Sequence, residues 1–167
     1  MLQCVYSGGQ TGVDIAALRA AKNNSLFVGG YVPHGWANLV RLRSFNMTEI
    51  EEMPLARALP RRSRLNVDCS HGTLAIRLQP SRGTDATISY ACTRTWQADT
   101  PTAGRQISTY RPTYVLTDLV PSRYPDILGW LRENSIGTLN VAGHRDTHYE
   151  PGVEEFLSGL FAEARSL

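Results

Sequence analysis

Short apolar runs alternate with segments of helical periodicity along most of the chain, and this alternation limits the fold more than any other feature. The runs that predict strands are Leu2–Tyr6, Leu26–Gly29, Thr73–Leu78, Thr113–Thr117 and Thr138–Ala142. The predicted helices are Val13–Lys22, Gly83–Trp96, Pro121–Asn134 and Pro151–Ala164, with a further short helix around Met47–Met53. Strands that alternate with helices favour an α/β fold with a largely parallel sheet.

Length and composition predict one domain spanning residues 1–167, because no repeat or linker divides the chain. No apolar run reaches the ~18–20 residues that span a membrane, so we expect no membrane partner. The three cysteines, Cys4, Cys69 and Cys92, are widely spaced and odd in number. Such a pattern is typical of a reduced, cytoplasmic protein.

The loop after the first predicted strand is rich in glycine. It contains Ser7, Gly8, Gly9, Gln10, Thr11 and Gly12, and Asp14 follows in the first helical turn. Parallel sheets bind ligands at the carboxyl ends of their strands, and a helix N-terminus there attracts anions. The sequence therefore predicts a phosphate site with Asp14 on a sugar hydroxyl. The alternative is a tight turn with Thr11 as N-cap and Asp14 stabilised only by the helix dipole.

Three further loops are expected at the same edge. Gly83 and Thr84 begin a predicted helix, whose N-terminus predicts a second phosphate-binding site with Arg82 neutralising the phosphate charge. The alternative is a helix that Thr84 merely caps. The loop after the second strand contributes His34, Gly35 and Trp36, and the loop after the last strand contributes Gly143 and Arg145. His144, His148 and Asp146 lie in a predicted loop rather than on one helix face, so we expect no metal site.

Basic residues are almost all arginine, and they cluster. Sixteen of the 17 are Arg, and six of these lie between positions 41 and 64. Arginine binds phosphate through bidentate hydrogen bonds, so one Arg of this cluster is expected to turn inward toward the site. A net charge of +2 favours a small anionic ligand over nucleic acid.

Taken together, these motifs resemble the putative molybdenum carrier family, whose members are Rossmann-like proteins of the SLOG superfamily, related to the lonely-guy type phosphoribohydrolases. The similar stretches include residues 7–14 with 16–18, 29–33 with Gly35, 62–63 with 66–67, 83–84, and 139–143 with 151–152. The resemblance implies a Rossmann-like three-layer sandwich with about five to seven strands. It also implies a nucleotide- or pterin-phosphate pocket, and self-association as a dimer or tetramer.

Some positions depart from the pattern that the resemblance implies. His34 replaces a Lys, His71 replaces an Asp, and Thr87 replaces the catalytic Glu of the phosphoribohydrolases. A hydroxyl cannot act as the carboxylate that stabilises an oxocarbenium ion. Asp14 and Asp85 are the candidates to substitute for it.

The leading hypothesis is therefore a protein that binds a phosphorylated, nucleotide-like small molecule, with molybdenum cofactor the example that the resemblance supplies. Backbone amides at 8–12 and 83–84 would hold phosphate, Arg62, Arg82 and Arg145 would neutralise it, and Asp14 and Asn66 would bind hydroxyls or a ring edge. Two alternatives remain open: an enzyme that hydrolyses the N-glycosidic bond of a nucleotide, and a protein that sequesters a nucleotide-derived signal.

Overall fold

A six-stranded parallel sheet forms the centre of the structure, a computed structural model that describes residues 1–93, 95–97, 108–110 and 112–166. Its strands run in the order β3-β2-β1-β8-β4-β7, and every neighbouring pair is parallel. The strands are β1 (Cys4–Tyr6), β2 (Phe27–Val32), β3 (Asn46–Glu49), β4 (Gly72–Ile76), β7 (Thr113–Leu116) and β8 (Thr138–Gly143). Two short strands, β5 (Thr95–Gln97) and β6 (Ser108–Tyr110), pair antiparallel outside this sheet.

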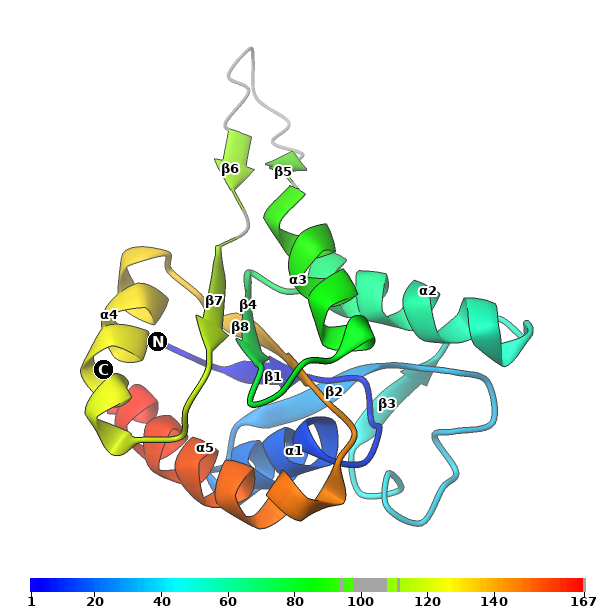
Figure 1. The fold of residues 1–167 in the computed structure, drawn as a ribbon, viewed down its shortest axis with the longest axis horizontal. Coiled ribbons are helices and arrows are strands. Elements are labelled where there is room, and N and C mark those ends of the chain that lie inside the picture. The colour runs from blue at the N-terminus through cyan, green and yellow to red at the C-terminus, as the bar shows by residue number, and fades with distance from the viewer. Residues whose placement is uncertain (94, 98–107, 111, 167) are drawn as a thin grey trace.

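Helices cover both faces of the sheet and produce the expected three layers (Figure 1). One face carries α1 (Val13–Asn23), α4 (Tyr124–Glu133) and α5 (Glu150–Arg165). The other face carries α2 (Leu55–Asp68) and α3 (Arg82–Thr93). Short 3-10 turns at Pro121–Arg123 and Thr147–Tyr149 precede α4 and α5.

The core lies between the sheet and the layer of α1, α4 and α5. All five residues of β4 are buried, as expected for a strand covered on both faces. Alanine-rich α1 buries eight residues, which lets it pack closely against β8 and α5. Phe156, Leu157, Leu160 and Phe161 of α5 close the core.

The two central strands come from opposite ends of the chain. β1 pairs with β8 through Cys4 and Thr138, and β8 pairs in turn with β4. The strand order changes direction here, because β2 and β3 continue to one side of β1 whereas β4 and β7 lie on the other side of β8. The loops after β1, β8 and β4 therefore leave the sheet next to one another, where α/β proteins bind ligands.

The α/β fold and the parallel sheet are confirmed, but two local predictions are wrong. The helix expected around Met47–Met53 is instead the edge strand β3, and the predicted helix Gly83–Trp96 ends at Thr93. Within that range Arg94 lies outside the described residues, and residues 95–97 form β5. The sequence also gave no signal for α2, whose buried positions include the polar Arg62 and Asn66.

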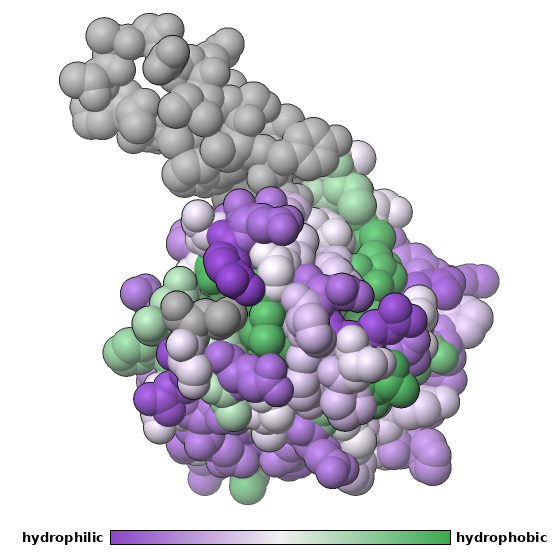
Figure 2. Space-filling view, turned by 90° about the vertical axis from the view of Figure 1, so that its left-hand side faces the viewer, coloured by the Kyte–Doolittle hydropathy of each residue, from purple (hydrophilic) through white to green (hydrophobic). Residues whose placement is uncertain are grey.

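The surface mixes polar and apolar side chains. On the face seen in Figure 2, hydrophobic residues are scattered among hydrophilic ones. The most exposed large hydrophobic residues include Phe27 on β2 and Val40 in the loop between β2 and β3. Within the described residues, no helix combines the length and the apolarity that crossing a membrane requires.

Candidate functional site

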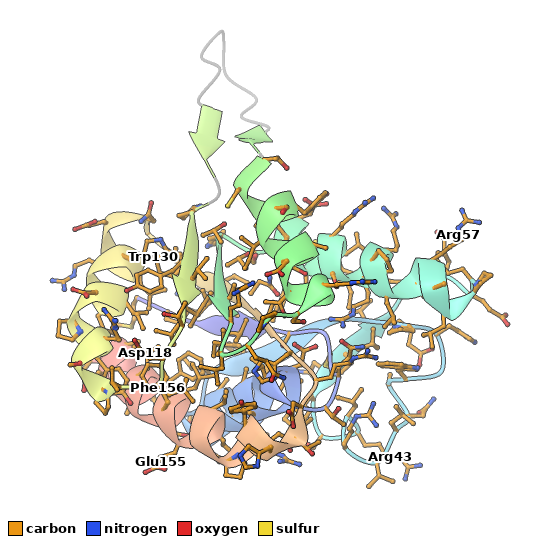
Figure 3. All side chains as sticks on the ribbon, viewed as in Figure 1. Arg43, Arg57, Asp118, Trp130, Glu155 and Phe156 are labelled. Carbon is orange, nitrogen blue, oxygen red and sulfur yellow. The ribbon has the colours of Figure 1, made fainter. Side chains whose placement is uncertain are left out.

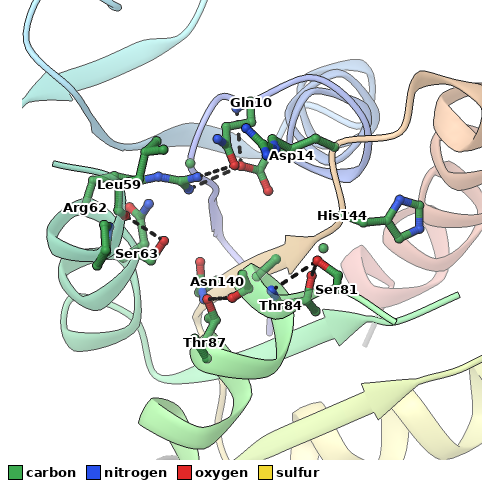
Figure 4. Close-up of a pocket in the computed structure, with 18 of the residues that line it drawn as sticks. Gln10, Asp14, Leu59, Arg62, Ser63, Ser81, Thr84, Thr87, Asn140 and His144 are labelled. Atoms are coloured by element: carbon green, nitrogen blue, oxygen red, sulfur yellow. Dashed lines mark hydrogen bonds and ion pairs between the residues drawn. The ribbon is translucent and has the colours of Figure 1, made fainter. Parts of the chain in front are cut away.

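A cavity of about 360 Å³ opens at the carboxyl ends of β1, β8 and β4, between α2 and α3. Figure 4 shows how side chains from α2, α3 and the strand-end loops surround it. Its volume lies at the lower end of the range for small-molecule sites. Ten residues proposed from the sequence line it: Gly8, Gln10, Asp14, Arg62, Asn66, Arg82, Gly83, Thr84, Gly143 and Arg145.

A buried ion pair forms one wall of the cavity. The Arg62 guanidinium donates to Asp14 Oδ2 at 3.3 Å and to Gln10 Oε1 at 2.6 Å, and the Gln10 backbone N–H also donates to Asp14 Oδ2. Asp14 is 3% exposed and Arg62 is 7% exposed. Burial raises the pKa of Asp14, and the Arg62 guanidinium opposes that rise. Arg62 is thus the inward-facing Arg expected from the cluster.

Gly8 makes this arrangement possible. A Cβ atom built on Gly8 would overlap the Arg62 guanidinium and lie 2.8 Å from Asp14 Oδ2. The glycine therefore lets the guanidinium lie directly against the loop backbone. Arg62 Nε is buried and has no hydrogen-bond partner among the described residues, so the pair uses only part of the donor capacity of this side chain.

The N-terminus of α1, by contrast, is already occupied by a carboxylate. The Gly12 N–H donates to Glu150 Oε1 at 2.7 Å, and Glu150 also pairs with Arg19 at 3.4 Å. The Thr11 hydroxyl donates to the Arg145 carbonyl instead of facing the cavity. Amides at positions 10 and 12 of the glycine-rich loop, which were expected to bind phosphate, therefore have protein partners.

The N-terminus of α3 is the open one. The Ser81 hydroxyl accepts from the Thr84 N–H at 3.4 Å and lies 3.0 Å from the Thr84 hydroxyl. The N–H groups of Arg82 and Gly83 have no partner within the described residues, and both residues line the cavity. A Cβ on Gly83 would meet nothing within 4 Å, so an approaching ligand has space here. These free donors, together with the helix dipole, favour an anion.

His144 adds a further polar residue to the lining of the cavity. It is 4% exposed, lines the cavity, and has no hydrogen-bond partner on either ring nitrogen among the described residues. Its ring packs edge-on against Tyr149 with centroids 4.8 Å apart. Burial lowers the pKa of His144, which favours the neutral ring with one donor and one acceptor.

Seven predicted residues do not line the cavity, and three of them follow β2. His34, Gly35 and Trp36 follow β2 and are not among the residues that line it. His34 Nδ1 lies 3.3 Å from Glu49 Oε2, and the Trp36 ring packs against the Arg41 guanidinium at 5.6 Å. Ser7, Gly9, Thr11 and Gly12 belong to the adjoining loop but do not line the cavity either.

Asn66 lines the cavity, but its amide group has backbone partners. Its Oδ1 accepts from the Tyr31 N–H at 2.7 Å, and its Nδ2 donates to the Tyr31 carbonyl at 3.2 Å. This pair of bonds ties α2 to β2 and holds the wall of the cavity in place. Asn66 therefore positions α2, and its amide has little capacity left for a ligand.

The two candidate catalytic carboxylates lie in different places. Asp14 is the one carboxylate among the described residues that line the cavity. Asp85 lies outside the cavity lining and pairs with Arg77, whose Nε lies 2.6 Å from Asp85 Oδ1. The Arg77 side chain lowers the pKa of Asp85 and keeps it ionised.

Several lining residues are not among the site residues expected from the sequence. These are Ser63 and Arg64 of α2, Ser81, Thr87 and Tyr90 around α3, and Asn140 on β8. Asn140 is 2% exposed, and its Nδ2 donates to the Thr73 hydroxyl. A polar residue inside an otherwise apolar strand is the signal that would have identified it.

Fold and cavity together define a Rossmann-like protein with a cavity at the carboxyl ends of its central strands. The chain matches the model of the circularly permutated YpsA SLOG family over residues 5–164, and it belongs to that family. The expected SLOG superfamily membership is confirmed. Circular permutation agrees with the central position of β1 and β8, which come from opposite ends of the chain.

A solved structure has the same fold. It is the 1.45 Å crystal structure of a putative molybdenum carrier protein from Syntrophus aciditrophicus SB, with a TM-score of 0.70 and 24% sequence identity. The similarity covers 95% of this chain and 92% of that one. No curated protein matches the chain.

Proposed function

We propose that the protein binds a small phosphorylated, nucleotide-like molecule in the cavity between α2 and α3. The observation that carries the proposal is the open N-terminus of α3, with the free N–H groups of Arg82 and Gly83, at the switch point of a parallel sheet. Such a site is typical of phosphate binding.

The charge of the lining supports an anionic ligand. Four arginines line the cavity, namely Arg62, Arg64, Arg82 and Arg145, against the one carboxylate of Asp14. Arg62 is engaged with that carboxylate, whereas Arg82 and Arg145 are exposed beside the open helix end. Arg43 and Arg57 belong, like Arg62, to the cluster of arginines between positions 41 and 64, but they point away from the body of the protein (Figure 3). The excess positive charge is therefore local to the cavity.

Molybdenum cofactor is a candidate ligand because the solved structure with this fold carries the name "putative molybdenum carrier protein". Its phosphate would suit the α3 N-terminus. None of the lining residues is a cysteine, and the described residues contain no group of three or more His, Cys, Asp or Glu side chains that could hold a metal ion. The cavity thus suits the phosphate and ring of such a molecule, and its described lining offers no thiolate to the metal.

The decisive experiment is mass spectrometry of small molecules released from the purified protein, followed by thermal-shift and calorimetric titration with nucleotides and pterin phosphates. We expect a phosphorylated compound to co-purify or to raise Tm. Arg82→Gln and Arg145→Gln should each weaken its binding, whereas Arg57→Gln on the outer surface of α2 should not. The proposal fails if no phosphorylated compound co-purifies and none in the panel binds.

A hydrolase of nucleotide N-glycosidic bonds is the second candidate, and Asp14 is the group that favours it. Asp14 is a buried carboxylate with a raised pKa in the cavity wall, a feature typical of catalytic acids. Release of free base from nucleoside monophosphates, lost in Asp14→Asn, would support this activity. Tight binding with the ligand returned unchanged would instead favour a carrier or a sequestering protein.

A further inference from the structure

We propose that the cavity holds its ligand in one direction, with the phosphate at the N-terminus of α3 and a planar heteroaromatic ring stacked at the other end, against Arg64 and Tyr90. This inference rests on the proposed function and specifies the ligand class: a ring joined to a phosphate through a spacer. The two ends of the cavity differ in their chemistry.

One end of the cavity is cationic and rich in donors. Ser81, Arg82 and Gly83 lie there, and His144 is also a lining residue. In Figure 4, Ser81 and Thr84 lie toward His144, while Leu59 and Ser63 of α2 lie on the opposite side. A phosphate can accept from free N–H groups, a hydroxyl and a guanidinium here.

The other end has apolar and flat surfaces. Leu59 and Pro60 of α2 and Ala86 and Tyr90 of α3 belong to the cavity lining, and in Figure 4 Leu59 lies on the side away from Ser81 and His144. The Thr87 hydroxyl donates to the Gly83 carbonyl at 3.0 Å, so it adds little polarity to this wall. An apolar wall with a flat group suits a ring better than a phosphate.

A stacked pair is already built at this end. The Arg64 guanidinium lies over the Tyr90 ring, 5.4 Å from its centroid, and the Tyr90 hydroxyl donates to Asp68 Oδ2 at 2.8 Å. The hydrogen bond fixes the orientation of the ring. Arg64 is exposed, so a ligand ring can continue the stack. Aromatic side chains and guanidinium planes are the groups on which nucleic-acid bases stack.

The distance between the two ends requires a spacer. Tyr90 lies seven residues after Gly83 on α3, which is ~10 Å along the helix axis. A ring at Tyr90 and a phosphate at Gly83 therefore cannot be bonded directly. A sugar between them would lie over the floor of the cavity, where Gln10, Asp14 and Asn140 provide polar atoms.

The test compares two probes that differ only in the ring: a nucleoside 5′-monophosphate and ribose 5-phosphate, titrated by calorimetry. Stacking predicts that the nucleotide binds about five- to a hundredfold more tightly. The preference should hold for all four bases, because stacking does not distinguish them. A wild-type protein that binds both probes equally would refute this inference and leave phosphate binding intact.

Variants then locate the ring. Arg64→Lys keeps the charge but removes the plane, and Tyr90→Leu removes the aromatic ring. Each should reduce the preference for the nucleotide severalfold without changing the affinity for ribose 5-phosphate, whereas Tyr90→Phe should retain the preference. Tyr114→Leu, which removes a tyrosine that packs on Trp130 outside the cavity, is the matched control.

The outcomes separate the two proposals. An unchanged preference in both Arg64→Lys and Tyr90→Leu, with melting curves that show folded protein, would overturn the ring placement. Equal loss of affinity for both probes in these variants would also overturn it, because the side chains would then serve the phosphate. If neither probe nor any other phosphorylated compound binds, both proposals fail.

Discussion

Replacing Arg62 by Met should be among the most destabilising substitutions in this chain. Arg62 and Asp14 are 7% and 3% exposed. Removing the guanidinium leaves a buried carboxylate whose remaining stabilising partners are the Gln10 N–H and the Ser7 side chain. Breaking a buried pair in this way costs about 3–5 kcal/mol. For a chain of this size that corresponds to a fall in Tm of about 6–20 °C.

The pH dependence gives the substitution a signature. Burial raises the pKa of Asp14 in the folded state above its unfolded value of ~3.9. The stability linked to this shift is fully present below the unfolded-state pKa. It is lost as the pH rises through the folded-state pKa. In Arg62→Met the opposing guanidinium is gone and the folded pKa rises further. The deficit relative to the wild type should therefore be largest at pH 8 and shrink as the pH falls toward 5.

Urea denaturation of four proteins at several pH values measures these effects: the wild type, Arg62→Met, Asp14→Leu, and the double variant. The double variant should recover most of the lost stability, because it leaves no unpaired charge. Arg123→Met, which breaks the exposed pair with Asp118, is the control and should change stability little. A pH-independent deficit in Arg62→Met, or a double variant no more stable than it, would refute this account.

Three further substitutions test other parts of the site by denaturant unfolding. Gly8→Ala places a methyl group on the Arg62 guanidinium and should cost about 1–3 kcal/mol; a neutral effect would mean that the pair is not packed against the loop. Asn66→Ala removes both hydrogen bonds to the Tyr31 backbone and should cost about 2 kcal/mol, with wild-type stability as the contrary result. Glu150→Gln keeps an acceptor near the N-terminus of α1 but removes the charge, so it should cost about 0.3–1 kcal/mol and less in high salt.

The helices and strands that pack against the core could be predicted from the sequence, because burial imposes an apolar period on them. Helix α5 illustrates this: Val153, Phe156, Leu157 and Leu160 are buried at helical spacing. Helix α2 was missed for the opposite reason. Its inner face includes Ala58, Arg62 and Asn66, also at helical spacing, but two of these are polar because that face borders a cavity.

The same limit applies to the site. The glycine-rich loop and Gly83-Thr84 were placed at the correct edge of the sheet, since loops after parallel strands meet there. His34, Gly35 and Trp36 follow β2, which lies one strand farther from the switch point than β1, and so they do not reach the cavity. Which residues line a cavity depends on the strand order, and the insertion of the last strand beside the first is not encoded in local periodicity.

That strand order also decides which helix end can accept an anion. Because β8 lies beside β1, the chain that follows β8 passes the start of α1 and brings Glu150 onto the Gly12 N–H. The N-terminus of α1 is thereby neutralised by the protein's own carboxylate. The N-terminus of α3 follows β4 on the other side of β8, and within the described chain no carboxylate hydrogen-bonds to its first N–H groups. Under the proposed function, a phosphate would therefore bind at Gly83 rather than at the glycine-rich loop, and Arg82 and Arg145 are the charges that it would meet there.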